Sequence, residues 1–377
     1  MASPTQPTSQ LACHRVLSSS AGTRVSPLCL GTMNFGEAWK HMMGECSKET
    51  SFKIMDHFFE QGGNFIDTAN AYQGEESEEW VGEWMAARNI RDQIVLATKF
   101  TSGYLSGKGG ESIKQNFTGN HSKSLHLSLE ASLKKLQTSY IDLLYVHWWD
   151  FSTSIPELMQ SLNRVVAAGK VLYLGISDTP AWVVSQANEY ARQNGLTQFS
   201  VYQGKWNAAT RDMERDILPM CEKEGMAIVP WGVLGSGQFK TKAQQEANSE
   251  GRKAFPNWEQ NIKITEKLAA VAKAKETVLT SIALAYIRHK YPYVYPIIGG
   301  RKLEHLQANI EALSIRLTDA EVDDIEDSAD FDIGFPMNMI FGMHDPSFKY
   351  RSRMTTSDIA LVQMNGTVLV PTKQSAP

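Results

Sequence analysis

The sequence predicts a (β/α)8 TIM barrel, in which eight parallel strands form a ring inside a layer of helices. Three observations favour this class. Short apolar runs recur along the chain and number eight, a polar or aromatic residue follows nearly every run, and helix-length amphipathic stretches separate them. The rival class is an open doubly wound sheet. It is less well supported, because no G-x-G-x-x-G loop of the kind that binds dinucleotides follows any of the runs.

The predicted elements follow one another in barrel order. An N-terminal hairpin comes first, because 14–16 and 23–25 have the pattern of short strands around a Ser-rich turn, and we expect it to cover one barrel end. The eight apolar runs are then predicted as the barrel strands. They occupy 27–30, 64–66, 94–98, 141–146, 171–176, 199–202, 226–230 and 294–298.

The segments between the runs have helical periodicity, as shown by Leu125, Leu129 and Leu133 on one face of the third segment. Several predicted helices also carry end signals. Ser154 with Glu157 and Thr318 with Glu321 fit capping boxes, Thr179 before Pro180 fits an N-cap, and Gly62 suits the position after a helix C-cap.

We expect one domain over 14–330, because no Pro- or Gly-rich linker and no step in charge divides the interior. Residues 1–13 are predicted as a flexible tail. Residues 331–377 are longer than a barrel requires and are interpreted either as a lid over a substrate pocket or as surface packing.

Composition restricts the classes of partner. A net charge of −4 at pH 7 argues against a nucleic-acid surface, which needs clustered Lys and Arg. No signal peptide or membrane span is evident, so we expect a cytoplasmic protein. The four cysteines lack C-x-x-C spacing, and no metal site is expected.

The residues that directly follow the strands are candidates for a functional site, because barrel active sites lie at the C-terminal ends of the strands. They are Asp67, Lys99, His147, Ser177, Asp178, Gln203, Trp231, Gly299, Gly300 and Arg301. Any one of them alone could be a turn or cap residue or a satisfied histidine. Their convergence on one barrel mouth favours a functional site.

Tyr72 follows Asp67 by five positions and adds an acid to this group. The usual pKa of tyrosine is near 10, and a nearby ammonium such as that of Lys99 can lower it. Asp67 would keep the lysine charged, and His147 could hold a substrate oxygen. These are the parts of a general acid for carbonyl reduction. A lyase or aldolase, in which Lys99 forms a Schiff base, is the alternative chemistry.

Five motifs in this order resemble the aldo-keto reductases, from about residue 25 to residue 325. They are Gly-Thr-Met-Asn at 31–34, Asn-Phe-Ile-Asp-Thr-Ala-Asn-Ala-Tyr at 64–72, Ala-Thr-Lys at 97–99, Ile-Asp-Leu-Leu-Tyr-Val-His at 141–147 and Leu-Gly-Ile-Ser-Asp at 174–178. The stretches 147–150 and 177–182, with the long tail, resemble the fungal aryl-alcohol dehydrogenase branch, which includes norsolorinic acid reductase-like enzymes.

The resemblance implies an NADP(H)-dependent oxidoreductase that interconverts an aromatic or bulky aldehyde or ketone and its alcohol. Asp67, Tyr72, Lys99 and His147 would form the catalytic tetrad, with Tyr72 as the general acid/base. Ser177, Asp178 and Gln203 would hold the carboxamide of the nicotinamide, and Trp231 would stack on its ring. The other implied cofactor residues are Gly31, Thr32, Gly232, Leu234, Lys240, Gly299, Arg301, Lys302, His305 and Asn309.

The chain departs from the family pattern at two cofactor positions: Asp178 replaces a usual Asn and His305 a usual Arg. Arg301 and Lys302 would receive the 2′-phosphate of NADP(H).

The substrate pocket is the remaining element to predict. Met33, Phe35, Trp39 and Trp148, with the loop 101–122, could form an apolar, aromatic wall, although ordinary packing would use the same residues. The expected partner is a small aromatic carbonyl or alcohol, and the sequence makes no prediction of oligomeric state. An NADPH-binding regulatory subunit with slow turnover is the alternative function, and the intact tetrad argues against it.

Overall fold

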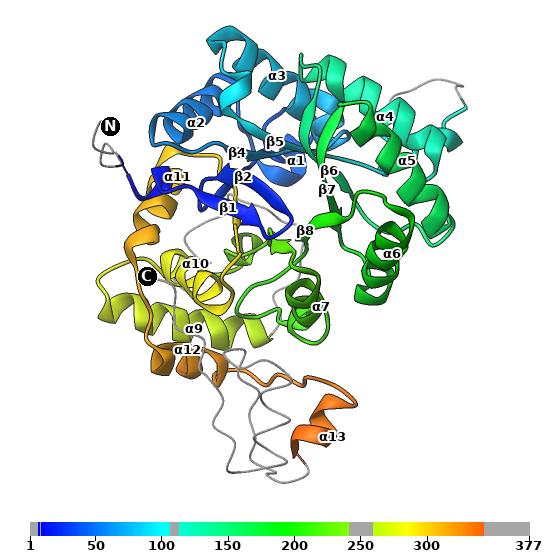
Figure 1. Cartoon of the computed structure of the whole chain (residues 1–377). Coiled ribbons are helices and arrows are strands. Elements are labelled where there is room, and N and C mark those ends of the chain that lie inside the picture. The colour runs from blue at the N-terminus through cyan, green and yellow to red at the C-terminus, as the bar shows by residue number, and fades with distance from the viewer. Residues whose placement is uncertain (1–6, 8, 106–112, 241–258, 343–377) are drawn as a thin grey trace, which may run out of the picture.

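The computed structural model describes residues 7, 9–105, 113–240 and 259–342 (Figure 1). Its main sheet has eight parallel strands in the order β10-β3-β4-β5-β6-β7-β8-β9. The strands are β3 (Cys29–Gly31), β4 (Phe65–Asp67), β5 (Val95–Phe100), β6 (Ile141–Val146), β7 (Val171–Ser177), β8 (Phe199–Gln203), β9 (Ala227–Ile228) and β10 (Ile297–Ile298).

The two edges of this sheet meet and close the ring. Ile228 of β9 forms a parallel bridge with Val294, and Ile297 N donates to Pro230 O at 2.9 Å. The barrel prediction is therefore confirmed, although the seventh and eighth strands are shorter than the apolar runs that predicted them.

Helices surround the strands on the outside of the ring (Figure 1). The longer ones are α2 (Lys48–Glu60), α3 (Glu76–Arg88), α4 (Ser122–Lys135), α5 (Ile155–Ala167), α6 (Ala181–Asn194), α7 (Ile217–Glu224), α9 (Glu259–Ala274), α10 (Leu279–Lys290), α11 (Leu303–Glu311) and α12 (Asp319–Glu326). Short helices include α1 (Lys40–Met43), α13 (Met337–Gly342) and the 3-10 turns η2 (Tyr72–Glu75) and η5 (Asp212–Glu214). No helix in the described ranges has the length and apolarity needed to cross a membrane.

The predicted hairpin is confirmed as β1 (Arg15–Ser18) and β2 (Ala21–Val25), which lie across the end of the barrel in Figure 1. Leu17, Ala21 and Val25 are buried in one cluster with residues of the barrel interior, among them Phe65 and Val201. The hairpin thus closes the end of the ring where the strands begin.

The predicted chain ends are only partly described. The tail expected at 1–13 ends earlier, because 10–12 form a 3-10 helix and Leu11 is fully buried. Residues 343–377 of the predicted extension lie outside the described residues, as does part of the loop 101–122.

The helix-end predictions had mixed outcomes. Thr318 and Glu321 form the complete capping box, and Gly62 follows the C-cap of α2 as expected. Ser154 caps α5, but the Glu157 carboxylate accepts from Ser122 N at 3.1 Å instead of completing a box. The Thr179 N-cap was wrong.

The reason lies in the local hydrogen bonding at the start of α6. Pro180 is the N-cap there, and the Thr179 hydroxyl donates to Ser177 O at 2.7 Å.

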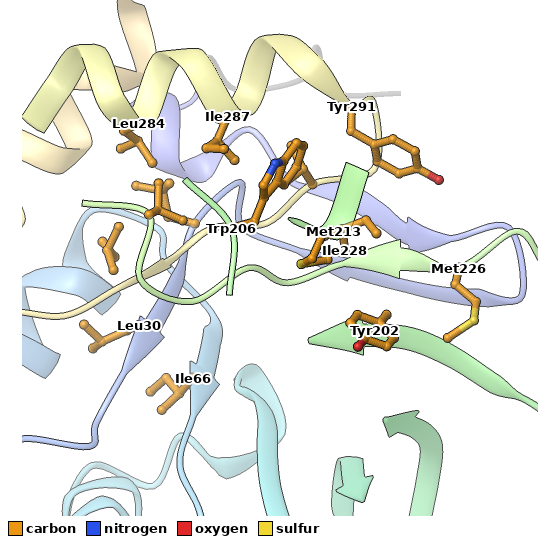
Figure 2. Close-up of a cluster of buried hydrophobic side chains, with 14 of the residues drawn as sticks. Leu30, Ile66, Tyr202, Trp206, Met213, Met226, Ile228, Leu284, Ile287 and Tyr291 are labelled. Carbon is orange, nitrogen blue, oxygen red and sulfur yellow. The ribbon is translucent and has the colours of Figure 1, made fainter. Parts of the chain in front are cut away.

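The main hydrophobic core lies between the strands and the helices. Figure 2 shows Leu284 and Ile287 of α10 pointing from the helix toward the strand layer, where Leu30 and Ile66 lie. All four are buried to 1% exposure or less. This packing fixes the strand ends in space, and the loops that follow them are therefore held at one mouth.

A buried group of charges joins the loop after β8 to α10 and α12. Glu214 accepts from Arg211 and Trp206 at 2.8 and 2.9 Å and also contacts Lys290. Lys290 contacts Glu326 at 2.8 Å, so two cations face two carboxylates. All three residues of the basic run 288–290 have structural partners, because Arg288 donates to Leu313 O, His289 contacts Asp319 and Lys290 contacts Glu214.

We expect Glu214→Gln to lower the free energy of unfolding by roughly 3–5 kcal/mol, because it leaves buried cations without a matching carboxylate. Burial raises the pKa of Glu214, but Lys290 and Arg211 outweigh this and lower it to about 2. The ionised carboxylate therefore contributes its full stability above the ordinary pKa of glutamate. The difference in free energy of unfolding between the unchanged protein and Glu214→Gln should narrow as pH falls through 4.5 toward 2.

Urea unfolding measures both effects. The matched control is Glu130→Gln, which breaks the exposed pair with Lys170 and should change stability by about 1 kcal/mol or less. Equal losses in the two variants would show that burial of the Glu214 cluster has no energetic consequence.

Candidate active site

A cavity of 580 Å³ opens at the C-terminal mouth of the barrel. Its described lining includes sixteen of the residues that the sequence predicted. They are Gly31, Met33, Asp67, Tyr72, His147, Asp178, Gln203, Trp231, Gly232, Leu234, Lys240, Gly299, Gly300, Arg301, Lys302 and His305. Eight of these residues were predicted from their positions directly after the strands, and most of the others came from the family resemblance.

A buried ion pair forms the floor of the site. Lys99 Nζ, at the end of β5, lies 2.5 Å from Asp67 Oδ1 at the end of β4 and also donates to Thr68 O at 2.8 Å. Gln203 Nε2 occupies the other carboxylate oxygen at 2.9 Å. Burial would lower the pKa of Lys99, but Asp67 and Tyr72 outweigh it and the pKa is raised. The amine is therefore charged, which disfavours a Schiff-base lysine.

Tyr72 lies above this pair and reaches the cavity. Lys99 Nζ is 5.0 Å from the centroid of the Tyr72 ring. Burial raises the pKa of Tyr72, and Lys99 offsets only part of this rise, so the pKa lies above its usual value. The sequence had predicted a lowered pKa, because it showed the ammonium but not the depth at which the phenol is buried. Tyr72 therefore holds its proton throughout the neutral pH range.

His147 stands across from Tyr72, with their rings 5.8 Å apart and edge to face. Burial and the charge of Lys99 lower the pKa of His147 to about 3, so the imidazole is neutral. Trp148 Nε1 donates to Ser102 Oγ at 3.2 Å, and Ser102 Oγ lies 3.3 Å from His147 Nδ1.

The contacts of His147 Nδ1 favour one of its two neutral tautomers. An indole can only donate, so Ser102 Oγ accepts from Trp148 and can still donate its own proton to Nδ1. We predict this arrangement, in which the imidazole proton is on Nε2 and can be donated to a ligand oxygen.

The far side of the cavity is formed by the ends of β7, β9 and β10. Trp231 Nε1 donates to Asp178 Oδ1 at 3.2 Å. The Asp178 carboxylate faces the cavity, where loss of solvation raises its pKa to about 6, against the effect of the Trp231 hydrogen bond. Ser177 Oγ is buried beside it and has no hydrogen bond of good geometry among the described residues.

Arg301 and Lys302 lie at the end of the cavity formed by the last strand. The Arg301 guanidinium packs against Gly44, where a Cβ would lie only 1.9 Å from Nη1. Gly44 also has φ 81°, so its backbone favours glycine, and a Cβ there would displace the Arg301 guanidinium. The segment 40–46 thus covers one side of Arg301.

Besides Lys99, Ser177, Trp39 and Trp148, which lie beside the lining residues, three predicted site residues are not part of the cavity lining. Thr32 is fully buried and bonds to Ser77 Oγ at 2.8 Å, and Phe35 is fully buried in the hydrophobic core. Asn309 is buried on α11. In each case alternation or helix phase turns the side chain inward. Trp39 and Trp148 do lie beside the site, with the Trp39 ring 6.3 Å from that of Tyr72.

A second cavity of 980 Å³ adjoins the first and shares Asp178 with it. Its described walls come from the loop after β8 and from 333–337 of the predicted extension. Phe151 and Phe335, which line it, are 72% and 80% exposed. Arg215 Nε donates to Asp332 O at 3.0 Å and ties the extension to this loop.

Some residues of the site escaped the sequence-based prediction. Ser102 follows β5 by two positions, so reading further into each loop would have found it. Asn34 lines the cavity and donates to Gly300 O at 2.7 Å. Only the fold shows this contact, because the two residues are far apart in sequence.

A parallel eight-stranded barrel with an Asp, Lys, Tyr and His group beside a cavity at its C-terminal mouth has the architecture of a barrel enzyme. The model of the aldo/keto reductase family matches residues 27–330. The chain belongs to the aldo/keto reductase family, whose members are oxidoreductases that use nicotinamide cofactors.

Close relatives carry names from fungal metabolism. Norsolorinic acid reductase A of Aspergillus parasiticus is 59% identical over 360 residues, 96% of this chain and 92% of the relative. Aryl-alcohol dehydrogenase GME11368 of Pestalotiopsis microspora is 56% identical over 88% of this chain and 86% of its own. A putative aryl-alcohol dehydrogenase of Saccharomyces cerevisiae is 53% identical over 89% and 91%.

We expect Ser102→Ala to give a mixture of the two neutral His147 tautomers, because Nδ1 then loses the hydroxyl donor that favours its unprotonated form. Nitrogen NMR of the imidazoles should show one neutral tautomer, protonated at Nε2, in the unchanged protein between about pH 5 and 8, and a mixture in the variant. Ser19→Ala, at the hairpin turn, is the control and should leave the His147 signals unchanged. A single Nε2-protonated form in both variants would mean that Ser102 does not select the tautomer.

Proposed function

We propose that this chain is an NADP(H)-dependent reductase and dehydrogenase for aromatic or bulky aldehydes, ketones and alcohols, with Tyr72 as the general acid/base. The observation that carries the proposal is the Lys99 ammonium, held between the Asp67 carboxylate and the Tyr72 ring. It supplies a fixed positive charge under the phenol at the moment when the phenol would lose its proton.

The proton chemistry follows from the states of the four side chains. Tyr72 is a neutral phenol at the cavity wall and can donate its proton to a carbonyl oxygen. His147 is neutral, so it can orient that oxygen by a hydrogen bond but does not supply a proton itself. The tyrosinate left by the transfer is stabilised by Lys99. Alcohol oxidation uses the same groups in reverse.

The bound nicotinamide supplies or receives the hydride at the substrate carbon. The residues present fit such a group. Ser177 Oγ is a buried polar atom without a good partner, and Gln203 and Asp178 line the same wall. These three would hold the carboxamide, and Trp231 would face the ring.

Gly232, Leu234 and Lys240 lie farther along the wall and would meet the pyrophosphate. Arg301 and Lys302, with His305, would receive the 2′-phosphate. A compact pair of cations at this end of the cavity favours NADP(H) over NAD(H).

Asp178 adds a property that an asparagine would lack. Near neutral pH its carboxylate is mostly ionised, since its pKa is about 6. A negative charge beside the ring site favours the cationic, oxidised nicotinamide over the neutral reduced one. The substitution therefore supports use of the site in alcohol oxidation as well as in carbonyl reduction.

The proposed substrate class follows from the walls of the two cavities. Trp39, Trp148 and Met33 lie beside Tyr72 and His147, and the adjoining cavity exposes two phenylalanines. Planar aromatic groups suit such surfaces. The relatives named norsolorinic acid reductase and aryl-alcohol dehydrogenase support an aromatic substrate of this kind.

We expect Tyr72→Phe to slow hydride transfer by ~10² to 10⁴, the usual contribution of a positioned general acid, while NADPH binding stays nearly the same. Single-turnover oxidation of bound NADPH by a panel of aromatic aldehydes and ketones measures the rate. The reaction must depend on the carbonyl compound, since slow decay independent of substrate would favour a regulatory subunit. Retention of more than about a tenth of the rate, with chemistry rate-limiting, would remove Tyr72 from this role.

We expect Arg301→Ala with Lys302→Ala to weaken NADPH binding by about 10² or more, because two charge-assisted contacts of roughly 1.5–3 kcal/mol each are removed. NADH lacks the 2′-phosphate and should bind almost as before. Fluorescence titration of both cofactors at two salt concentrations measures the difference, and salt should affect the unchanged protein more.

The control for this pair is Lys123→Ala with Lys134→Ala, two exposed lysines of α4. It removes the same charge from the protein but should leave both affinities unchanged. Equal losses for NADH and NADPH in the Arg301 and Lys302 variant would indicate a disturbed loop, and no loss would place the phosphate site elsewhere.

A further inference from the structure

The backbone directly after Tyr72 has a costly conformation. Gln73, Gly74 and Glu75 have φ values of 53°, 64° and 93°, so three consecutive residues lie in the left-handed region. Gly74 adopts this conformation freely, but each of its neighbours does so at a cost of roughly 1–2 kcal/mol. Such conformations persist only where the surroundings hold them.

The first side chain that holds this turn belongs to Gln73, which is 1% exposed. Its amide donates to Met33 O at 3.0 Å and accepts from Trp39 N at 2.7 Å. These contacts fasten the front of the turn to the loop after β3.

The other side of the turn is held by a lysine that is distant in sequence. Lys135, the last residue of α4, has a side chain only 8% exposed. Its Nζ donates to Asn70 O at 2.9 Å and lies 3.0 Å from Glu75 Oε2 and 2.7 Å from Glu78 Oε2. These three acceptors lie just before, within and just after the turn that carries Tyr72.

The same contacts reach the strand that carries Lys99. Thr98 Oγ1 donates to Glu78 Oε1 at 2.5 Å, and Asn70 N donates to Lys99 O at 3.1 Å. Burial would lower the pKa of Lys135, but Glu78 and Glu75 outweigh it and the pKa is raised, so the ammonium is charged. One buried cation therefore links the loop of the proposed acid to the strand of the ammonium beneath it.

We propose that Lys135 is a positioning residue, which fixes the Tyr72 hydroxyl over Lys99 by holding Asn70 O and the Glu75 carboxylate. The inference rests on the proposed role of Tyr72. To join α3 to α4, Lys135 would need only its contact with the Glu78 carboxylate. It also contacts Asn70 O, two residues before Tyr72, and the carboxylate of the left-handed Glu75.

The test is a double-mutant cycle with Lys135→Met and Tyr72→Phe, read as the single-turnover rate of hydride transfer with NADPH and an aromatic aldehyde. Methionine keeps the aliphatic stem and removes the ammonium. We expect Lys135→Met alone to slow the rate by ~10- to 100-fold, because small displacements of a catalytic group have effects of this size. NADPH affinity should stay within about twofold, and Lys135→Arg should recover part of the rate.

The cycle separates positioning from stability. If Lys135 acts through Tyr72, the double variant should be no slower than Tyr72→Phe, because no hydroxyl remains to be positioned. A double variant slowed by the product of the two single effects would overturn the inference and leave the function of Tyr72 intact. A normal rate in Lys135→Met would also overturn it. A Tyr72→Phe rate like that of the unchanged protein would overturn both the proposed function and this inference.

A second variant and a control keep the test decisive. Lys135→Met leaves two buried carboxylates unpaired and could fail to fold. Glu75→Gln is nearly isosteric, removes one of these charges and should show the same lack of additivity with Tyr72→Phe. Lys290→Met removes a lysine that is buried more deeply than Lys135 and whose carboxylates lie on η5 and α12. It should lower the midpoint of thermal unfolding, and any slowing of the rate should multiply with that of Tyr72→Phe.

Discussion

Burial of the Lys99 ammonium is the constraint on which the site depends. An uncompensated ammonium in a protein interior is costly, and Lys99 is 1% exposed. Asp67 supplies the opposite charge, Thr68 O takes another proton of the ammonium, and Gln203 satisfies the second oxygen of Asp67. These partners come from β4, β5 and β8, so only a closed ring brings them together. The buried ion pair of the site therefore requires the closed barrel.

The loop after β3 connects the two ends of the mouth. On one side Gln73 and Glu76 bind its backbone, the latter by accepting from Glu37 N and Ala38 N at 2.6 and 3.1 Å. On the other side Asn34 donates to Gly300 O, and Gly44 packs against Arg301. The loop that carries Met33 and Trp39 thus contacts both the turn of the proposed acid and the proposed phosphate site. A change at either end can therefore displace Met33 and Trp39, which we propose as part of the substrate pocket.

The sequence predicted what depends on periodicity and position. Eight apolar runs became eight strands, and reading the residue after each strand located Asp67, Lys99, His147, Asp178, Gln203 and Trp231 at one mouth. It could not predict how far a side chain is removed from solvent. Phe35 lies two residues before an exposed loop position yet enters the core, and loss of solvation at Tyr72 outweighs the effect of Lys99 on its pKa. Contacts between distant segments were also missed, because Lys135 and Asn70 carry no local signal of their partnership.

The two ends of the barrel divide stability and chemistry between them. At the end where the strands begin, Leu17, Ala21 and Val25 of the hairpin bury apolar surface against the interior. At the mouth, left-handed residues, a buried ammonium, a neutral histidine and a carboxylate with a raised pKa are gathered within one cavity wall. Left-handed backbone at non-glycine residues and a carboxylate with a raised pKa cost folding free energy at neutral pH. These features lie on loops that the strands and the outer helices hold in place. The stability of the whole barrel therefore offsets their unfavourable free energy and maintains the geometry at the mouth.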